Sequence, residues 1–170
     1  LTNDILFLQE MDMVLPEFQS LNMVEVVDKV INKYKDKAQA RQITLTKKGE
    51  SNTSNVQGDA KSLERAVTAL VDNAVKFSKP GGEVEIGFAE QGNQVSISVL
   101  DHGIGIEPEI RSRIFDRFFH LEKNGDELYS GVGIGLSITR QVIRQHKGSL
   151  DVESTPDKGS KFTITLLKWK

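Results

Sequence analysis

The 170-residue chain has no cysteine and no apolar run near the ~20 residues needed to cross a membrane. The lack of cysteine excludes disulfides and thiolate metal sites and is compatible with a reducing compartment. No secretory signal is visible. The three histidines, His102, His120 and His146, lack metal-ligand spacing. A net charge of −2 argues against electrostatic nucleic-acid binding, so no nucleic-acid partner is expected.

The composition is that of a soluble globular protein, with 38% hydrophobic and 27% charged residues. The length favours one domain with a short appendage. Leu1 begins inside an apolar-rich segment with helical spacing, and Pro16 ends that element. We therefore interpret the chain as part of a longer protein, with an appendage at residues 1–15 and a domain at residues 16–170.

The clearest element is a helix over residues 59–77. Asp59 is a suitable N-cap, and the run Ser78–Gly82 stops the helix. Its apolar residues follow a 3.6-residue period and form one stripe: Leu63, Ala66, Val67, Leu70, Val71, Ala74 and Phe77.

The other elements are shorter. A helix of about four turns begins near Val24, and a second helix covers residues 135–146. An extended piece is expected at 17–22, a polar turn at 49–55, short helical pieces at 110–119 and a mobile polar loop at 121–130. Strands are expected at 42–47, 84–89, 95–100, 149–153 and 161–167. This order favours an α+β fold, a two-layer sandwich with helices on one face of a mixed, mainly antiparallel sheet.

Two glycine clusters suggest a bipartite nucleotide site. The first begins with a carboxylate, Asp101, directly after a strand-like run, and continues through Gly103 and Gly105. The second, at residues 131–136, leads straight into a helix. Glycine lets the backbone approach a ligand closely, and a helix N-terminus favours phosphate.

Four polar residues are candidates for this site, and each has a plain structural alternative. Asn73 offers an amide oxygen for Mg²⁺ and Lys76 a positive charge for phosphate, although on this helix alone both fit ordinary solvated positions better. Asp101 suits an exocyclic amine such as that of adenine, or simply a turn. Arg117 suits a phosphate contact or a surface charge.

Together these segments resemble the ATP-binding catalytic domain of sensor histidine kinases, within the ATPase superfamily that includes gyrase and MutL. The resemblance covers about residues 20–168. It is carried by four boxes in order: an N-box at residues 63–78, a glycine box at 101–106, an F-box at 114–119 and a second glycine box at 131–138. Four ordered boxes are far more specific than one motif.

The resemblance implies a Bergerat-type fold that binds ATP and Mg²⁺. Asn73 would hold Mg²⁺, Lys76 would contact phosphate, and Asp101 would bind the adenine amine. Residues 121–130 would form a lid over the nucleotide. The implied nucleotide-binding set is Asn73, Lys76, Phe77, Asp101, Gly103, Gly105, Ile106, Phe119, Gly131, Val132, Gly133, Gly135 and Leu136.

The resemblance also implies partners. Residues 1–15 resemble the end of a dimerisation and phosphoacceptor domain. In that family, a histidine of this domain accepts the γ-phosphoryl group, and the partner that follows is the receiver domain of a response regulator. No such histidine is present here, so the chain alone should not autophosphorylate. The domain would be cytoplasmic, and its parent protein a homodimer that is either membrane-anchored or soluble.

Two departures from the family pattern leave alternatives open. Ala69 occupies a position that is usually polar or acidic, and His120 stands where related kinases often carry arginine. These changes keep a second hypothesis open, a degenerate kinase that acts as an ATP-binding regulatory or scaffold domain. An ATP-hydrolysing clamp of the gyrase or MutL type is a weaker third hypothesis.

Overall fold

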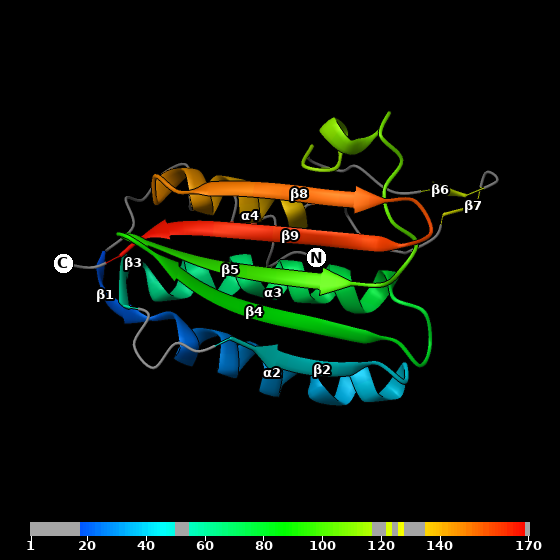
Figure 1. The fold of residues 1–170 in the computed structure, drawn as a ribbon, viewed down its shortest axis with the longest axis horizontal. Coiled ribbons are helices and arrows are strands. Elements are labelled where there is room, and N and C mark those ends of the chain that lie inside the picture. Colours follow the sequence, from blue (N-terminus) through cyan, green and yellow to red (C-terminus); the bar gives the residue numbers. More distant parts are fainter. Residues whose placement is uncertain (1–17, 50–54, 117–121, 124–125, 128–134, 169–170) are drawn as a thin grey trace.

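In a computed structural model, the described part of the protein is a two-layer sandwich, with a five-stranded main sheet covered by the helices α2, α3 and α4 (Figure 1). The structure describes residues 18–49, 55–116, 122–123, 126–127 and 135–168. The expected segments at 1–15 and most of 117–134 therefore lie outside the described residues. The main sheet has the order β2-β4-β5-β9-β8, from β2 (Thr44–Lys48), β4 (Glu83–Gln91), β5 (Gln94–Asp101), β9 (Gly159–Leu167) and β8 (Ser149–Thr155).

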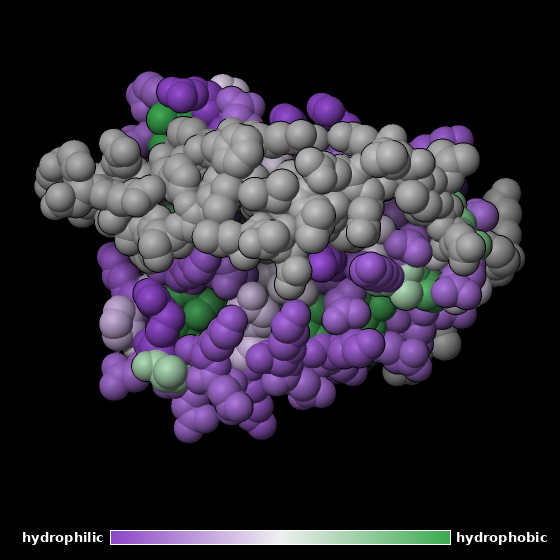
Figure 2. Space-filling view, turned by 180° about the vertical axis from the view of Figure 1, so that it is seen from behind, coloured by the Kyte–Doolittle hydropathy of each residue, from purple (hydrophilic) through white to green (hydrophobic). Residues whose placement is uncertain are grey.

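The three helices cover one face of the sheet, with α3 (Ala60–Phe77) between α2 (Met23–Ala40) and α4 (Gly135–Gln145). The apolar stripe of α3 is buried from Leu63 to Ala74, as its periodicity predicts. Seen from behind, the described part of the helical face is mainly hydrophilic (Figure 2). Among the described residues, no helix is both long and apolar enough to cross a membrane.

The core lies between the sheet and α3. Alternate residues of the central strands point to it, for example Ile86 on β4, Ile97 on β5 and Ile164 on β9, each at most 1% exposed. This period of two is the one that predicted these strands. All neighbouring pairs in the sheet are antiparallel except β2–β4, which confirms the mixed, mainly antiparallel sandwich.

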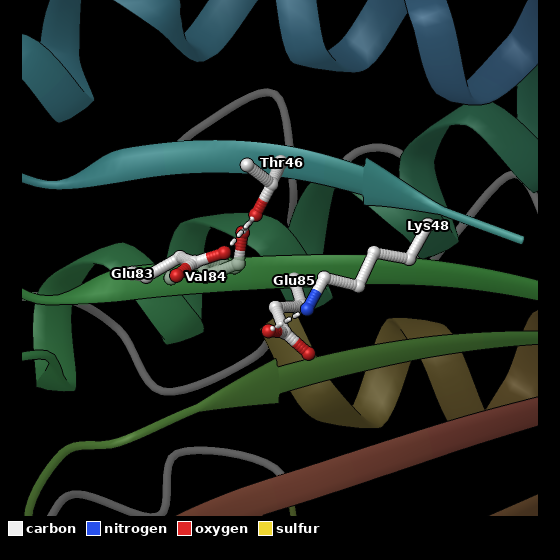
Figure 3. Close-up of polar contacts among 5 residues, drawn as sticks. All are labelled: Thr46, Lys48, Glu83, Val84 and Glu85. Atoms are coloured by element: carbon white, nitrogen blue, oxygen red, sulfur yellow. Dashed lines mark hydrogen bonds and ion pairs between the residues drawn. The ribbon is translucent and has the colours of Figure 1, made fainter.

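The parallel β2–β4 pair carries polar cross-strand contacts (Figure 3). The Thr46 hydroxyl donates to Glu83 at 2.5 Å, and the Lys48 ammonium donates to Glu85 at 2.6 Å. The carboxylate of Glu85 raises the pKa of Lys48. Because opposite charges on facing strands favour one alignment, these contacts support the register of the pair.

Strand β3 (Asn55–Gly58) was not expected. It pairs antiparallel with β1 (Gln19–Asn22), the extended piece that the sequence predicted. The polar turn predicted over 49–55 therefore extends too far, because Asn55 belongs to β3. Shorter elements are the 3₁₀ turn η1 (Arg111–Arg113) and the two-residue strands β6 (Glu122–Lys123) and β7 (Asp126–Glu127).

A buried histidine joins the start of α3 to the end of α4. Asp59 caps α3 by accepting from the Ser62 N–H at 3.0 Å, and its own N–H donates to His146 Nε2 at 3.0 Å. His146 Nδ1 lies 2.7 Å from the Val142 carbonyl, so the ring is neutral with its proton on Nδ1. Phe18 stacks on this ring with centroids 4.7 Å apart.

Burial lowers the pKa of His146 below its ordinary 6.5, against smaller opposing effects of Val142 and Asp59. Below pH 6.5 the unfolded chain therefore binds a proton that the folded chain resists. The stability that neutral His146 provides is complete above that pH and is lost as the pH falls. We expect this loss to reach at most about 1.4 kcal/mol at one pH unit below 6.5.

Urea unfolding at pH 7.5 and 5.5 checks this expectation. His146→Gln should lower the stability at pH 7.5 but reduce its dependence on pH. The exposed His102 provides the control, because His102→Gln should keep the dependence of the unaltered chain. An unchanged dependence in His146→Gln would show that His146 is not its source.

Candidate functional site

A cavity opens where β5 and α3 end and α4 begins. It has an empty volume of about 630 Å³, counting the space open to solvent. The described residues that line it are Asn73, Phe77, Asp101, Gly105, Ile106, Ile114, Gly135, Leu136, Ser160 and Phe162.

Asp101 is the one acidic residue among those that line the cavity, and only 4% of its surface is exposed. Its Oδ1 accepts two backbone N–H groups, from Gly103 at 2.9 Å and from Ser160 at 3.3 Å. No donor among the described residues is recorded for Oδ2. The carboxylate is therefore held by one oxygen and can offer the other to a ligand.

Burial raises the pKa of Asp101, because removing the carboxylate from water disfavours its charged form. The N–H groups of Gly103 and Ser160, and the charge of nearby His102, oppose this effect. The Oδ2 atom can accept a further hydrogen bond when a donor enters the cavity. A ligand with an N–H group can supply that donor.

The loop after Asp101 is held between α3 and the β8–β9 turn. On one side the Ile104 N–H donates to the Phe77 carbonyl at 3.3 Å. On the other side, the Asp157 N–H donates to the Ile104 carbonyl at 2.7 Å, and the Ile106 N–H donates to the Ser154 hydroxyl at 2.8 Å. The loop therefore has a fixed path around the cavity.

Apolar side chains surround the carboxylate. Ile106, Ile114 and Phe162 line the cavity and are each at most 7% exposed. Phe115 packs edge-on against Phe162, with ring centroids 6.2 Å apart. A planar heteroaromatic group with an amino substituent fits an apolar cavity that has one buried acceptor.

Asn73 places an amide at the cavity, one turn before the end of α3. No hydrogen bond of this amide to another described residue is recorded, so its oxygen can serve a ligand. The described residues hold no cluster of three or more acidic, histidine or cysteine side chains suited to a metal. A single amide oxygen fits Mg²⁺, because this ion keeps several waters and binds substrate phosphates.

The structure brings most of the expected site residues together. Asn73, Phe77, Asp101, Gly105, Ile106, Gly135 and Leu136 line the cavity. Gly103 supports it through its N–H bond to Asp101, and an added Cβ there would overlap the Phe77 carbonyl. Lys76 is not among the lining residues, and its ammonium pairs with Asp72 at 2.9 Å. Outside the described residues lie Arg117, Phe119, His120, Gly131, Val132 and Gly133.

Three lining residues were not expected from the sequence: Ile114, Ser160 and Phe162. Ser160 reaches the site because it lies directly opposite Asp101 in the β5–β9 register. Phe162 follows it on the same face of β9. The strands β5 and β9 are far apart in the sequence, and no local pattern indicates that they pair.

Comparison with known proteins gives a consistent result. Residues 58–170 match the family described as histidine kinase-, DNA gyrase B- and HSP90-like ATPase. The chain is 33% identical over 152 residues to the sensor-like histidine kinase SenX3 of Mycolicibacterium smegmatis, covering 89% of this chain and 39% of that protein. It is 41% identical over 110 residues to the histidine protein kinase SaeS of Staphylococcus epidermidis, covering 64% of this chain and 31% of that protein.

A solved structure of the mycobacterial sensor histidine kinase MprB is also similar. Its TM-score is 0.75 at 29% identity, covering 89% of this chain and 97% of that one. This chain therefore shares the architecture of that kinase, while it spans less than two fifths of the length of SenX3 and SaeS.

The contact between the loop and the β8–β9 turn yields a stability prediction. Gly105 has a φ of +71°, and an added Cβ would overlap the Thr155 carbonyl. We expect Gly105→Ala to destabilise the fold by about 3 kcal/mol, from backbone strain and steric overlap together. Urea unfolding of the purified variant measures this change.

Gly92 is the matched control, because it has a φ of +59° and no atom within 4 Å of an added Cβ. Gly92→Ala should cost only the backbone strain, about 1 kcal/mol. Equal losses in the two variants would mean that the loop does not press against the β8–β9 turn.

Proposed function

The chain belongs to the histidine kinase-, DNA gyrase B- and HSP90-like ATPase family, and from this premise we propose that it binds Mg-ATP and donates the γ-phosphoryl group to a histidine. That histidine lies on a separate phosphoacceptor domain of the same protein, in two-component signal transduction. The names of the relatives, sensor histidine kinases, support this role. The observation that carries the proposal is the buried Asp101 carboxylate with one oxygen open to an apolar cavity.

Asp101 selects adenine through the direction of one hydrogen bond. Its Oδ2 accepts from the exocyclic amine of adenine, whereas guanine carries an oxygen at the corresponding ring position. Ile106, Ile114 and Phe162 cover the base. The binding energy comes from removing apolar surface from water and from giving the buried carboxylate a donor.

The phosphates then lie toward Asn73 and the start of α4. Asn73 would hold Mg²⁺ through its amide oxygen, and the ion would neutralise charge on the phosphates. Gly135 opens α4 beside Asn73, and the N-terminus of a helix favours anions. The phosphoacceptor histidine attacks the γ-phosphorus, the bond to the bridging oxygen breaks, and ADP leaves.

The remaining parts of the proposal concern the longer protein. Residues 1–15 would be the end of the phosphoacceptor helix, and residues 16–170 the catalytic domain. The phosphohistidine would supply a receiver domain of a response regulator. The domain would work in the cytoplasm, within a homodimeric parent.

Calorimetric titration with the non-hydrolysable ATP analogue AMPPNP, with and without Mg²⁺, tests the nucleotide site. Asp101→Asn should keep an acceptor for Gly103 and Ser160 but turn an N–H donor toward the adenine amine. We expect AMPPNP to bind at least about 30-fold more weakly. The melting temperature should stay equal or rise, because a neutral side chain avoids the cost of a buried charge.

The exposed Asp151 on β8 is the matched control, and Asp151→Asn should leave binding unchanged. A guanine analogue should bind the unaltered chain more weakly than AMPPNP. Equal affinity of Asp101→Asn and the unaltered chain for AMPPNP would remove Asp101 from the site.

Labelling with γ-³²P ATP tests phosphoryl transfer. The chain alone should gain no phosphohistidine, since the phosphoacceptor histidine that the resemblance implies is not present in it. A longer protein that includes the preceding phosphoacceptor helices should gain an acid-labile label, and Asp101→Asn should abolish it. An unlabelled longer protein that still binds ATP would favour a regulatory or scaffold domain, which Ala69 and His120 also suggest. Strong ATP hydrolysis by the chain alone would favour a clamp-type ATPase.

A further inference from the structure

The Lys76 ammonium lies against a carboxylate instead of in the cavity. Its Nζ is 2.9 Å from Asp72 Oδ2, one helical turn earlier on α3. An acid four residues before a base is the favourable order for such a pair. Asn73 and Phe77, each directly after one member of this pair in the sequence, both line the cavity. Lys76 is therefore close to the site but turned to another partner.

Asp72 is held in place from the neighbouring helix. The buried Tyr34 on α2, 6% exposed, donates its hydroxyl to Asp72 Oδ1 at 3.1 Å. The Lys37 ammonium lies 5.0 Å from the centroid of the Tyr34 ring. Each oxygen of Asp72 therefore has a partner, the phenol on one and Lys76 on the other. Because Tyr34 is part of the core, opening the ion pair would move the lysine and leave the aspartate in place.

The lysine is free enough to move. Its side chain is 39% exposed and that of Asp72 is 31% exposed, and ion pairs that water reaches to this extent are weak. The ammonium is carried on a flexible four-carbon chain. Since Lys76 lies one turn beyond Asn73, a polyphosphate held near Asn73 can offer the ammonium several negative charges in place of one.

We propose that Asp72 is a positioning residue that holds the Lys76 ammonium away from the cavity in the ligand-free chain, and that nucleotide phosphates take the ammonium over by ion-pair exchange. This inference rests on the proposed nucleotide site. It assigns Asp72 the role of a competitor for Lys76, so that Asp72 lowers the affinity for phosphorylated ligands. Tyr34 holds Asp72 in place after the Lys76 ammonium has moved to the phosphates.

A double-mutant cycle tests the exchange. Calorimetric Kd values for AMPPNP, ADP and adenosine are measured at a fixed Mg²⁺ concentration for the unaltered chain, Asp72→Asn, Lys76→Met and the double variant. We expect Asp72→Asn to tighten AMPPNP about three- to tenfold, ADP less, and adenosine not at all. In the Lys76→Met background the gain should vanish, because no ammonium remains to be released.

Glu64→Gln is the matched control, since Glu64 lies two turns earlier on α3 and also pairs with a lysine, Lys29 at 3.6 Å. It removes the same charge and should change AMPPNP affinity less than twofold. Melting temperatures establish that all variants fold. If the gain in AMPPNP affinity persists without Lys76, or if Glu64→Gln reproduces it, the effect comes from the net charge of the protein and the exchange is wrong. An unchanged or weaker affinity of Asp72→Asn would also overturn the exchange. No AMPPNP binding by the unaltered chain would instead overturn the proposed function, and the exchange with it.

Discussion

The packing of α3 against the sheet, between the other two helices, is the constraint on which the rest of the structure depends. Its apolar stripe is buried from Leu63 to Ala74 against the core. Burial of that many side chains fixes both the rotation and the axial position of the helix. Because the helix cannot rotate, the polar residues at the edge of the stripe have fixed directions as well. Asn73 reaches the cavity for that reason.

The two ends of α3 carry different kinds of polar contact. At the first end, the Asp59 carboxylate caps α3, and the Asp59 N–H donates to His146, which bonds to the Val142 carbonyl. These hydrogen bonds join the start of α3 to the end of α4. Near the other end of α3, Asp101 of β5 lines the cavity. Its Oδ1 accepts hydrogen bonds from Gly103 and Ser160, and its Oδ2 is open to the cavity. The open oxygen can accept a hydrogen bond from a ligand that enters the cavity. The contacts of Asp59 and His146 therefore stabilise the fold, whereas the open oxygen of Asp101 is suited to binding a ligand.

Charge near the cavity is arranged in a similar way. The ion pair of Asp72 and Lys76 satisfies both side chains in the ligand-free chain, and Tyr34 ties the pair to α2. Such a pair contributes little to stability, because water reaches both partners. Its weakness is what allows the lysine to change partner, as the exchange that we propose requires. Helix α2 contributes no described residue to the lining of the cavity, and the Tyr34 contact connects it to the site.

The sequence by itself determined the elements whose signal is local. The 3.6-residue period of α3, the alternation in β4, β5 and β9, and the cap at Asp59 are confirmed because each depends on neighbouring residues alone. The glycine box after Asp101 also indicated the site, because a carboxylate followed by closely spaced glycines is visible in a short window. Only the tertiary structure decided which distant residues meet. Strand β3 exists through its pairing with β1, and Ser160 joins the site through its register with Asp101. Tyr34 on α2 meets Asp72 on α3 through the packing of the two helices. These contacts depend on strand register and helix packing, which a periodic pattern in one segment does not specify.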